Sequence, residues 1–219
     1  MSAMRYGMLI DLERCVGCGA CAMACKQEHG TAANVHYCRI VHGETGVYPE
    51  SKIVSMPYAC MHCMNAPCAT ACSTGATYRD TDTGIVRVDY EMCDGCGACT
   101  AECPYDVREF NPREGDASGQ YWGADAEATP FEAAKSTNRV PGVAQKCQFC
   151  YERLEQGGLP ACVETCIVSA RIFGDLDDAD GELARAIEER GAQQVYPDEA
   201  TGASVYYVGD LSYLDGSAV

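Results

Sequence analysis

Four groups of cysteines dominate the chemistry that this chain can perform. The most regular group lies between Cys93 and Pro104, where four thiols follow the spacing C-x2-C-x2-C-x3-C-P. This spacing is typical of loops that hold cubane iron–sulfur clusters through thiolate ligands. Three thiolates of such a loop bind one cluster, and the fourth, here Cys103, reaches a neighbouring cluster. One such loop therefore predicts a second cysteine group that completes the exchange.

Three further groups repeat or vary this pattern. The first has the same spacing, and residues 10–21 resemble residues 88–99 position by position, which indicates an internal repeat. The second and fourth groups have middle gaps of four and eleven residues, and a proline precedes the third cysteine of each. The groups are Cys15, Cys18, Cys21 and Cys25; Cys60, Cys63, Cys68 and Cys72; Cys93, Cys96, Cys99 and Cys103; and Cys147, Cys150, Cys162 and Cys166.

Sixteen thiolates in four groups suit four [4Fe–4S] clusters with four thiolates each. Only twenty residues separate Cys72 from Cys93, and alternating residues around a turn predict a β-hairpin there. We therefore pair the second group with the third and the first with the fourth; pairing first with second and third with fourth is the alternative. The predicted ligand sets are Cys15, Cys18, Cys21 and Cys166; Cys25, Cys147, Cys150 and Cys162; Cys60, Cys63, Cys68 and Cys103; and Cys72, Cys93, Cys96 and Cys99.

Other uses of cysteine fit the spacing less well. Structural zinc favours two C-x2-C pairs separated by a longer loop, and only the fourth group has that form. Disulfide scaffolds are usually shorter secreted chains. Cys38 lies outside every group and is expected to be a free cysteine. Because no Ser/His/Asp or Cys/His constellation offers a nucleophile, we expect no catalytic residue.

Composition restricts the partners. The formal net charge is −16, and thiolate-bound clusters would add further negative charge. Nucleic acid is therefore an unsuitable partner, and a basic or neutral protein surface is favoured. The mean hydropathy is −0.18, and no apolar run approaches the roughly 18 residues of a membrane helix. The first residues lack the features of a signal peptide.

Short elements are expected to position the cysteines. Residues 26–59 otherwise have a mixed, loop-like composition, and 111–146 form a long insertion with the only tryptophan, which favours a docking loop. The expected strands are 7–11, 52–56, 76–79, 85–88, 106–110, 170–174 and 204–208, and the expected helices are 151–157 and 181–190, with a helical turn around the fourth cysteine of the first group.

Several stretches resemble the iron–sulfur subunits of molybdopterin oxidoreductases in the dimethyl sulfoxide reductase family. The resemblance extends to the subunits of polysulfide, tetrathionate and arsenate reductases and of transhydroxylases and catechol dehydroxylases. It departs from the family at Ser73 and Ile167, where proline is common. The matching stretches are 8–18, 25–28, 66–68, 73–76, 147–150, 158–162 and 174–178, within about residues 4–110 and 144–210.

The resemblance implies an α+β fold in which two ferredoxin-like modules hold four [4Fe–4S] clusters, with short β-hairpins, helices, a loop insertion and a C-terminal tail. It agrees with the predicted pairing of the cysteine groups. The expected divisions are a module of residues 1–55 and 140–180, an inserted module of 56–110, a possible docking loop at 111–146, and a tail at 181–219 with a helix and a strand.

The implied function is electron transfer between an external donor and the molybdenum or tungsten bis-pterin site of a large catalytic partner. A membrane anchor subunit or a soluble donor would supply the electrons. The alternatives are a free-standing soluble polyferredoxin and the electron subunit of a formate dehydrogenase or hydrogenase. Residence in the cytoplasm, or outside it after co-export with the partner, is compatible with the chain. Lys26 is a candidate for a charge beside a cluster, and His62 for a hydrogen bond to one, or else for packing.

Overall fold

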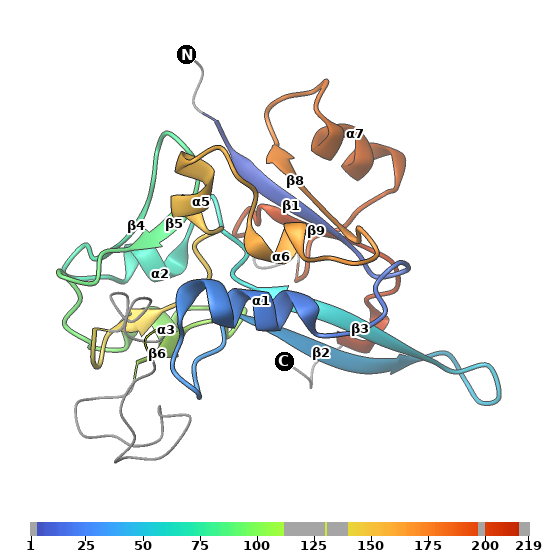
Figure 1. The fold of residues 1–219 in the computed structure, drawn as a ribbon, viewed down its shortest axis with the longest axis horizontal. Helices are drawn as coiled ribbons and strands as arrows, with labels where there is room; N and C mark the ends of the chain where they lie inside the picture. The colour runs from blue at the N-terminus through green and yellow to red at the C-terminus, as the bar shows by residue number, and fades with distance from the viewer. Residues whose placement is uncertain (1–3, 112–129, 131–139, 197–199, 215–219) are drawn as a thin grey trace.

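The computed structural model describes residues 4–111, 130, 140–196 and 200–214, and the rest of the chain is left out of the description. Short helices and small sheets alternate along this part of the chain (Figure 1), which confirms the mixed class of the fold. Most of the expected docking loop at 111–146, with Trp122, lies outside the described residues. No helix among the described residues has the length and apolar character needed to cross a bilayer.

A three-stranded sheet with the order β8-β1-β9 supports one side of the molecule. β1 (Tyr6–Asp11) pairs antiparallel with β8 (Arg171–Asp175) and parallel with β9 (Val205–Val208). The strand expected near the C-terminus is therefore the third strand of a sheet that begins at the N-terminus. Strands predicted at 7–11, 170–174 and 204–208 lie within a residue of these bounds.

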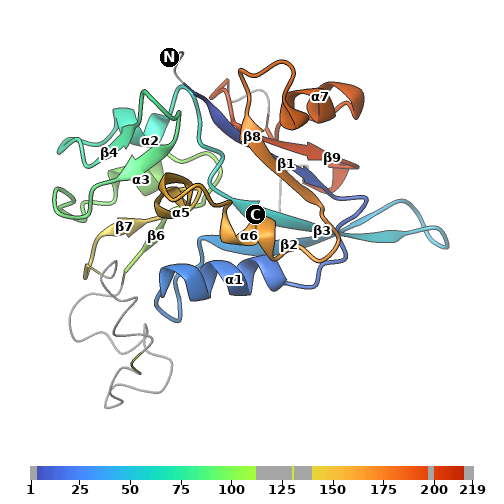
Figure 2. The ribbon, with the colours of Figure 1, turned by 45° about the horizontal axis from the view of Figure 1, so that its top comes forward.

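The central strand β1 is buried on both faces. Leu9 packs against Leu183 of α7 (Glu182–Glu189), whereas Met8 and Ile10 contact the main core. Opposite faces of one strand thus join two apolar clusters, which explains why its sequence is a continuous apolar run. Figure 2 shows α7 covering the sheet on the side away from α1 (Ala20–His29).

A long hairpin extends from the body of the molecule (Figure 1). Its strands, β2 (Cys38–Thr45) and β3 (Lys52–Ala59), pair antiparallel from Cys38 opposite Ala59 to Thr45 opposite Lys52. The prediction of a mixed, loop-like segment at 26–59 was wrong at 26–29, where α1 continues to His29, and at 38–45, where β2 is regular strand; residues 30–37 and 46–51 are loop as expected. The register gives β2 its backbone partners, a tertiary effect that its polar sequence does not reveal.

Smaller elements surround the second and third cysteine groups. They form the expected hairpin of β4 (Thr77–Arg79) and β5 (Val86–Val88). The strand predicted at 106–110 is reduced to β6 (Glu109–Phe110), paired with β7 (Ala144–Gln145), since Asp106 has a φ of 46° that breaks extended backbone. The short helices are α2 (Pro67–Thr70), α3 (Ala98–Ala101), α5 (Tyr151–Glu155) and α6 (Ala161–Glu164), and a 3-10 turn covers Ser212–Leu214.

Candidate iron–sulfur sites

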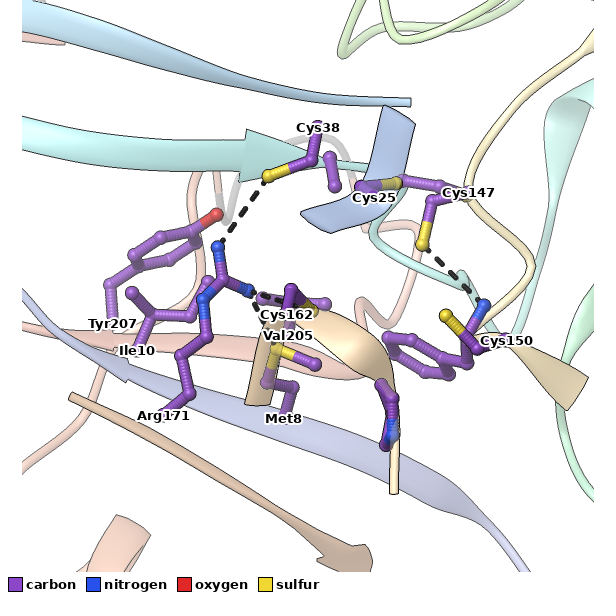
Figure 3. Close-up of a pocket in the computed structure, with 14 residues that line it drawn as sticks. Met8, Ile10, Cys25, Cys38, Cys147, Cys150, Cys162, Arg171, Val205 and Tyr207 are labelled. Atoms are coloured by element: carbon purple, nitrogen blue, oxygen red, sulfur yellow. Dashed lines mark hydrogen bonds between the residues drawn. The ribbon is translucent and has the colours of Figure 1, made fainter. Parts of the chain in front are cut away.

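One apolar cavity lies between the sheet, α1 and the fourth cysteine group (Figure 3). Met8 of β1 and Val205 of β9 form part of its apolar wall. Its sulfur-bearing wall comes from α1, from the turn before α5 and from α6, so segments that are distant in the sequence meet there. The thiols that line it include Cys25, Cys147, Cys150 and Cys162, which are together one predicted ligand set.

A second cavity lies among the second and third groups. Its lining includes the apolar side chains of Met61, Val86 and Val107, with the guanidinium-bearing residue Arg108. Its thiols are Cys60, Cys63, Cys68 and Cys103, which are together another predicted set. Cys60 also lines the first cavity, so the two cavities share a wall.

The remaining two predicted sets lie nearer the surface. Cys18 and Cys96, at equivalent positions of the repeat, are exposed. Burial raises the pKa of Cys15, a hydrogen bond from Gly17 opposes that rise, and the charges of Cys21 and of Cys166, which belongs to the fourth group, add to it.

The same electrostatic contact is found at the other end. Burial raises the pKa of Cys99, and the charges of Cys68, Cys93 and Cys72 add to the rise. The third group therefore lies within interaction distance of two members of the second group.

Glycines in the repeated loops permit this convergence. Gly17 and Gly95 occupy equivalent positions with φ of 65° and 72°, a region that glycine enters without strain. A Cβ at Gly95 would collide with the carbonyl oxygen of Gly142, and one at Gly17 would collide with Ser55. The loops are thus tight both in conformation and in the space around them.

Backbone N–H groups point at several of the sulfurs. Thr77 N donates to Cys72 Sγ at 3.3 Å, and Ala170 N donates to Cys166 Sγ at 3.2 Å. Burial by itself would raise the pKa of Cys72, but hydrogen bonds from Thr77 and Thr74 outweigh it and lower the pKa. Such donors stabilise thiolate ligands and influence the potential of a cluster bound to them.

The buried thiols are suited to bind a cluster, because its iron would neutralise the charge of their thiolates. Burial raises the pKa of Cys147 and of Cys63 to about 12, and raises that of Cys25 well above its usual range, with neighbouring thiolates adding to each rise. Binding to iron would displace the protons that these thiols otherwise hold. Among the described residues, no three His, Cys, Asp or Glu side chains converge tightly enough to hold a single metal ion.

Comparison with known proteins agrees with this chemistry. A family profile described as a 4Fe-4S dicluster domain matches residues 51–120 and 116–176, and a 4Fe-4S binding domain matches residues 6–27. The arsenate respiratory reductase iron–sulfur subunit ArrB of Shewanella sp. strain ANA-3 is 34% identical over 94% of this chain and 96% of its own length. The chain belongs to the iron–sulfur subunits of the dimethyl sulfoxide reductase family. Its cofactors are [4Fe–4S] clusters.

Two further relatives are also named as subunits of reductases. A Halobacterium salinarum protein, provisionally named as the iron–sulfur subunit of a dimethyl sulfoxide reductase, is 39% identical over 94% of this chain and 80% of its own length. A tetrathionate reductase subunit of Salmonella typhimurium is 35% identical over 94% and 72%, respectively. The family that the sequence motifs indicate is therefore confirmed.

The subunit also places a buried arginine among its thiols, which the sequence analysis missed. Arg171 of β8 donates through Nη1 to Cys162 Sγ at 3.6 Å and Met8 Sδ at 3.1 Å, and through Nη2 to Cys38 Sγ at 3.6 Å (Figure 3). A hydrogen bond from Cys38 lowers the pKa of Cys21 to about 5, although burial opposes the change. Cys38 thus interacts with Cys21 and with Arg171 without belonging to a predicted set.

The two other candidate side chains, half-buried Lys26 and buried His62, are held by definite contacts. The Lys26 ammonium donates to the carbonyl oxygens of Ala32 and Val35, both at 2.9 Å, and so fixes the loop after α1. His62 stacks on Phe149 with ring centroids 3.7 Å apart, and its Nδ1 accepts a hydrogen bond from Val86 N at 3.1 Å. Packing, one of the roles considered for His62, is therefore present; a charge effect of Lys26 on a cluster stays a prediction.

Proposed function

We propose that this iron–sulfur subunit carries electrons through four [4Fe–4S] clusters and is not catalytic alone. The electrons pass between an external donor and a molybdenum or tungsten bis-pterin site in a large catalytic partner. Each cluster takes its thiolates from one of the four ligand sets predicted above. In every set three thiolates come from one cysteine group and the fourth comes from the paired group.

The observation that carries this proposal is the arrangement of the thiols as a chain. Cys60 lines both buried cavities, so the clusters proposed there are neighbours. Cys25 and Cys21 lie on α1 one turn apart, which joins the first cavity to the outer set that contains exposed Cys18. Cys99 of the other outer set interacts with Cys68 of the second cavity. Electrons can therefore enter near one exposed cysteine and leave near the other.

The two ferredoxin-like modules are part of the proposal. Residues 1–55 and 140–180 hold the first and fourth groups, and 56–110 hold the second and third. The tail at 181–219 supports the first module, since β9 pairs with β1 and α7 packs on the same sheet. The insertion at 111–146 is proposed to dock the catalytic partner.

Subunit status is supported by the relatives, because the names of the arsenate, tetrathionate and dimethyl sulfoxide reductase relatives describe subunits of reductases. The test is anaerobic purification of this chain at native level from its source. We expect co-elution with a much larger polypeptide that contains molybdenum or tungsten. Elution alone near 23.5 kDa with full iron content would instead indicate a free polyferredoxin, and a large partner without either metal would contradict the proposed pterin site.

A further inference from the structure

Two buried arginines occupy the same position relative to the last cysteine of a group. Arg108 follows Cys103, and Arg171 follows Cys166, in both cases after four intervening residues. Only 5% of Arg108 and 6% of Arg171 is exposed. Each belongs to a different proposed module, and in each module the arginine follows the later of the two cysteine groups.

Arg171 interacts with thiols of both ligand sets proposed for its module. Its Nη1 donates to Cys162 Sγ at 3.6 Å, and Cys162 belongs to the inner set. Its positive charge contributes to the lowered pKa of Cys21. It also opposes the rise that burial causes in the pKa of Cys15. Both thiols belong to the outer set. Figure 3 shows the guanidinium between the sulfurs of Cys38 and Cys162.

Arg108 has the corresponding surroundings in the other module. Its Nη1 donates to Thr77 Oγ1 at 3.1 Å, whereas Nε and Nη2 are buried and have no hydrogen-bond partner among the described residues. It lines the cavity that contains Cys68, and it interacts electrostatically with Cys68 of the inner set and Cys99 of the outer set. Two guanidinium nitrogens, which together carry three N–H donors, are thus left over beside a proposed cluster site.

Neither guanidinium has an ordinary counter-ion. Several surface arginines pair with carboxylates, as Arg153 does with Glu28 at 3.0 Å. Among the described residues no carboxylate lies within ion-pair distance of Arg108 or Arg171. The other buried cation, Lys146, differs because its ammonium donates hydrogen bonds to the carbonyl oxygens of Val86 and Cys147. An unpaired buried charge is strongly unfavourable, so an anion is expected beside each arginine.

We propose that Arg108 and Arg171 are the internal counter-cations of the two modules, each placed between two clusters and raising the reduction potential of both. The inference rests on the proposed function, because the anions are the thiolate-bound clusters. Reduction adds one electron to a cluster and transfers no atom. Because the reduced cluster is more negative than the oxidised cluster, the nearby positive charge stabilises the reduced cluster more. Net charge and hydrogen bonds to sulfur are recognised determinants of cluster potential.

The test is a redox titration with dithionite, followed by electron paramagnetic resonance, on the complex with its partner. Arg171→Met should lower the ratio of reduced to oxidised cluster at least tenfold at a fixed potential for two of the four signals. A tenfold change corresponds to about 59 mV for a one-electron couple. Arg108→Met should affect the other two signals in the same direction.

Charge-conserving and remote variants serve as controls. Arg171→Lys and Arg108→Lys should keep the potentials closer to those of the unaltered protein than the methionine variants do. Arg185→Met removes an exposed positive charge from α7 and should change no signal. Iron content and co-elution with the partner, measured on the same samples, report separately on the proposed function.

Three results would overturn the inference. One is a methionine variant that keeps four clusters with unchanged potentials. Another is a shift of all four signals by either arginine variant, because each charge is assigned to one module. If the methionine variants lose iron, Arg171→Gln and Arg108→Gln replace them, since glutamine keeps N–H donors without the charge. Unchanged potentials in these glutamine variants are the third result, which would leave the arginines a purely structural role.

Discussion

The proposed module of the first and fourth cysteine groups differs from the proposed module of the second and third in its regular secondary structure. The first rests on a three-stranded sheet whose central strand is buried on both faces, with α7 packed against it. Residues 56–110 contain the end of β3, the three-residue strands β4 and β5, and the two-residue strand β6, which pairs with β7 outside that range. Regular backbone pairing can position the thiols of the first module, whereas the second depends more on its clusters. Secondary structure and cofactor therefore contribute unequally to two sites of similar chemistry.

The largest difference should appear when iron is removed. After anaerobic chelation, amides of residues 60–110 should exchange hydrogen about a hundredfold faster, because regular backbone pairing in that region is confined to strands of two and three residues. Amides of β1, β8 and β9 should keep most of their protection. Hydrogen exchange with mass spectrometry checks this, and equal loss of protection in both regions would remove the proposed difference.

Loss of one ligand should separate cluster-binding cysteines from the structural one. Cys63→Ser should release about one cluster's iron, or about four of sixteen atoms, because Cys63 is a proposed ligand. Cys38→Ser changes a thiol that is also buried but lies outside the proposed sets, so iron content should stay the same. Iron and sulfide analysis of anaerobic samples measures both. Matching losses from the two variants would mean that the ligand sets are assigned wrongly.

A core substitution in the sheet region should weaken folding without changing the clusters. Leu183 of α7 is 1% exposed and packs on Leu9 and Val208. Leu183→Ala should cost about 2–5 kcal/mol of folding free energy, seen as a lower denaturant midpoint for the first module. The exposed neighbour Glu188→Ala is the control and should cost less than about 0.5 kcal/mol. A change in cluster potentials with Leu183→Ala would contradict the view that the sheet region stabilises the fold without setting the potentials of the clusters.

The smallest effect concerns the histidine that joins the two modules. Burial lowers the pKa of His62 well below its usual range, and the charges of Lys146 and Arg108 lower it further. The unfolded chain therefore takes up a proton below about pH 6.5 that the folded protein does not. As the pH is lowered through that range, folding stability therefore falls by up to about 1.4 kcal/mol per pH unit. In His62→Asn, which keeps an acceptor for Val86 N, the slope should be smaller. Denaturation midpoints between pH 5 and 7 in both proteins measure the difference, and identical slopes would contradict it.

Local patterns in the sequence predict the features of this protein that are decided by residues close to one another in the sequence. The spacing from Cys93 to Cys103 identifies the cofactor, and the apolar face of α7 with Leu183 identifies a packed helix. The strand β2 escaped prediction because Arg39 and His42 give it a polar character, and its pairing with β3 is decided in three dimensions.

The buried cations show a different limit. Nothing in the sequence singles out Arg108 or Arg171, because arginine is rarely buried without a partner. Their shared spacing after a cysteine is visible in the sequence, but its meaning depends on which thiols converge around them in the fold. The contact of Cys38 with Arg171 is equally a consequence of tertiary packing.

The pairing of distant cysteine groups is the central claim, and the iron anomalous signal in an anaerobic crystal structure tests it most directly. We predict four iron clusters, one of them bonded to Cys25, Cys147, Cys150 and Cys162, and a second bonded to Cys60, Cys63, Cys68 and Cys103. A cluster that joins thiols of the first group to thiols of the second, or zinc in place of iron at these positions, would contradict the account.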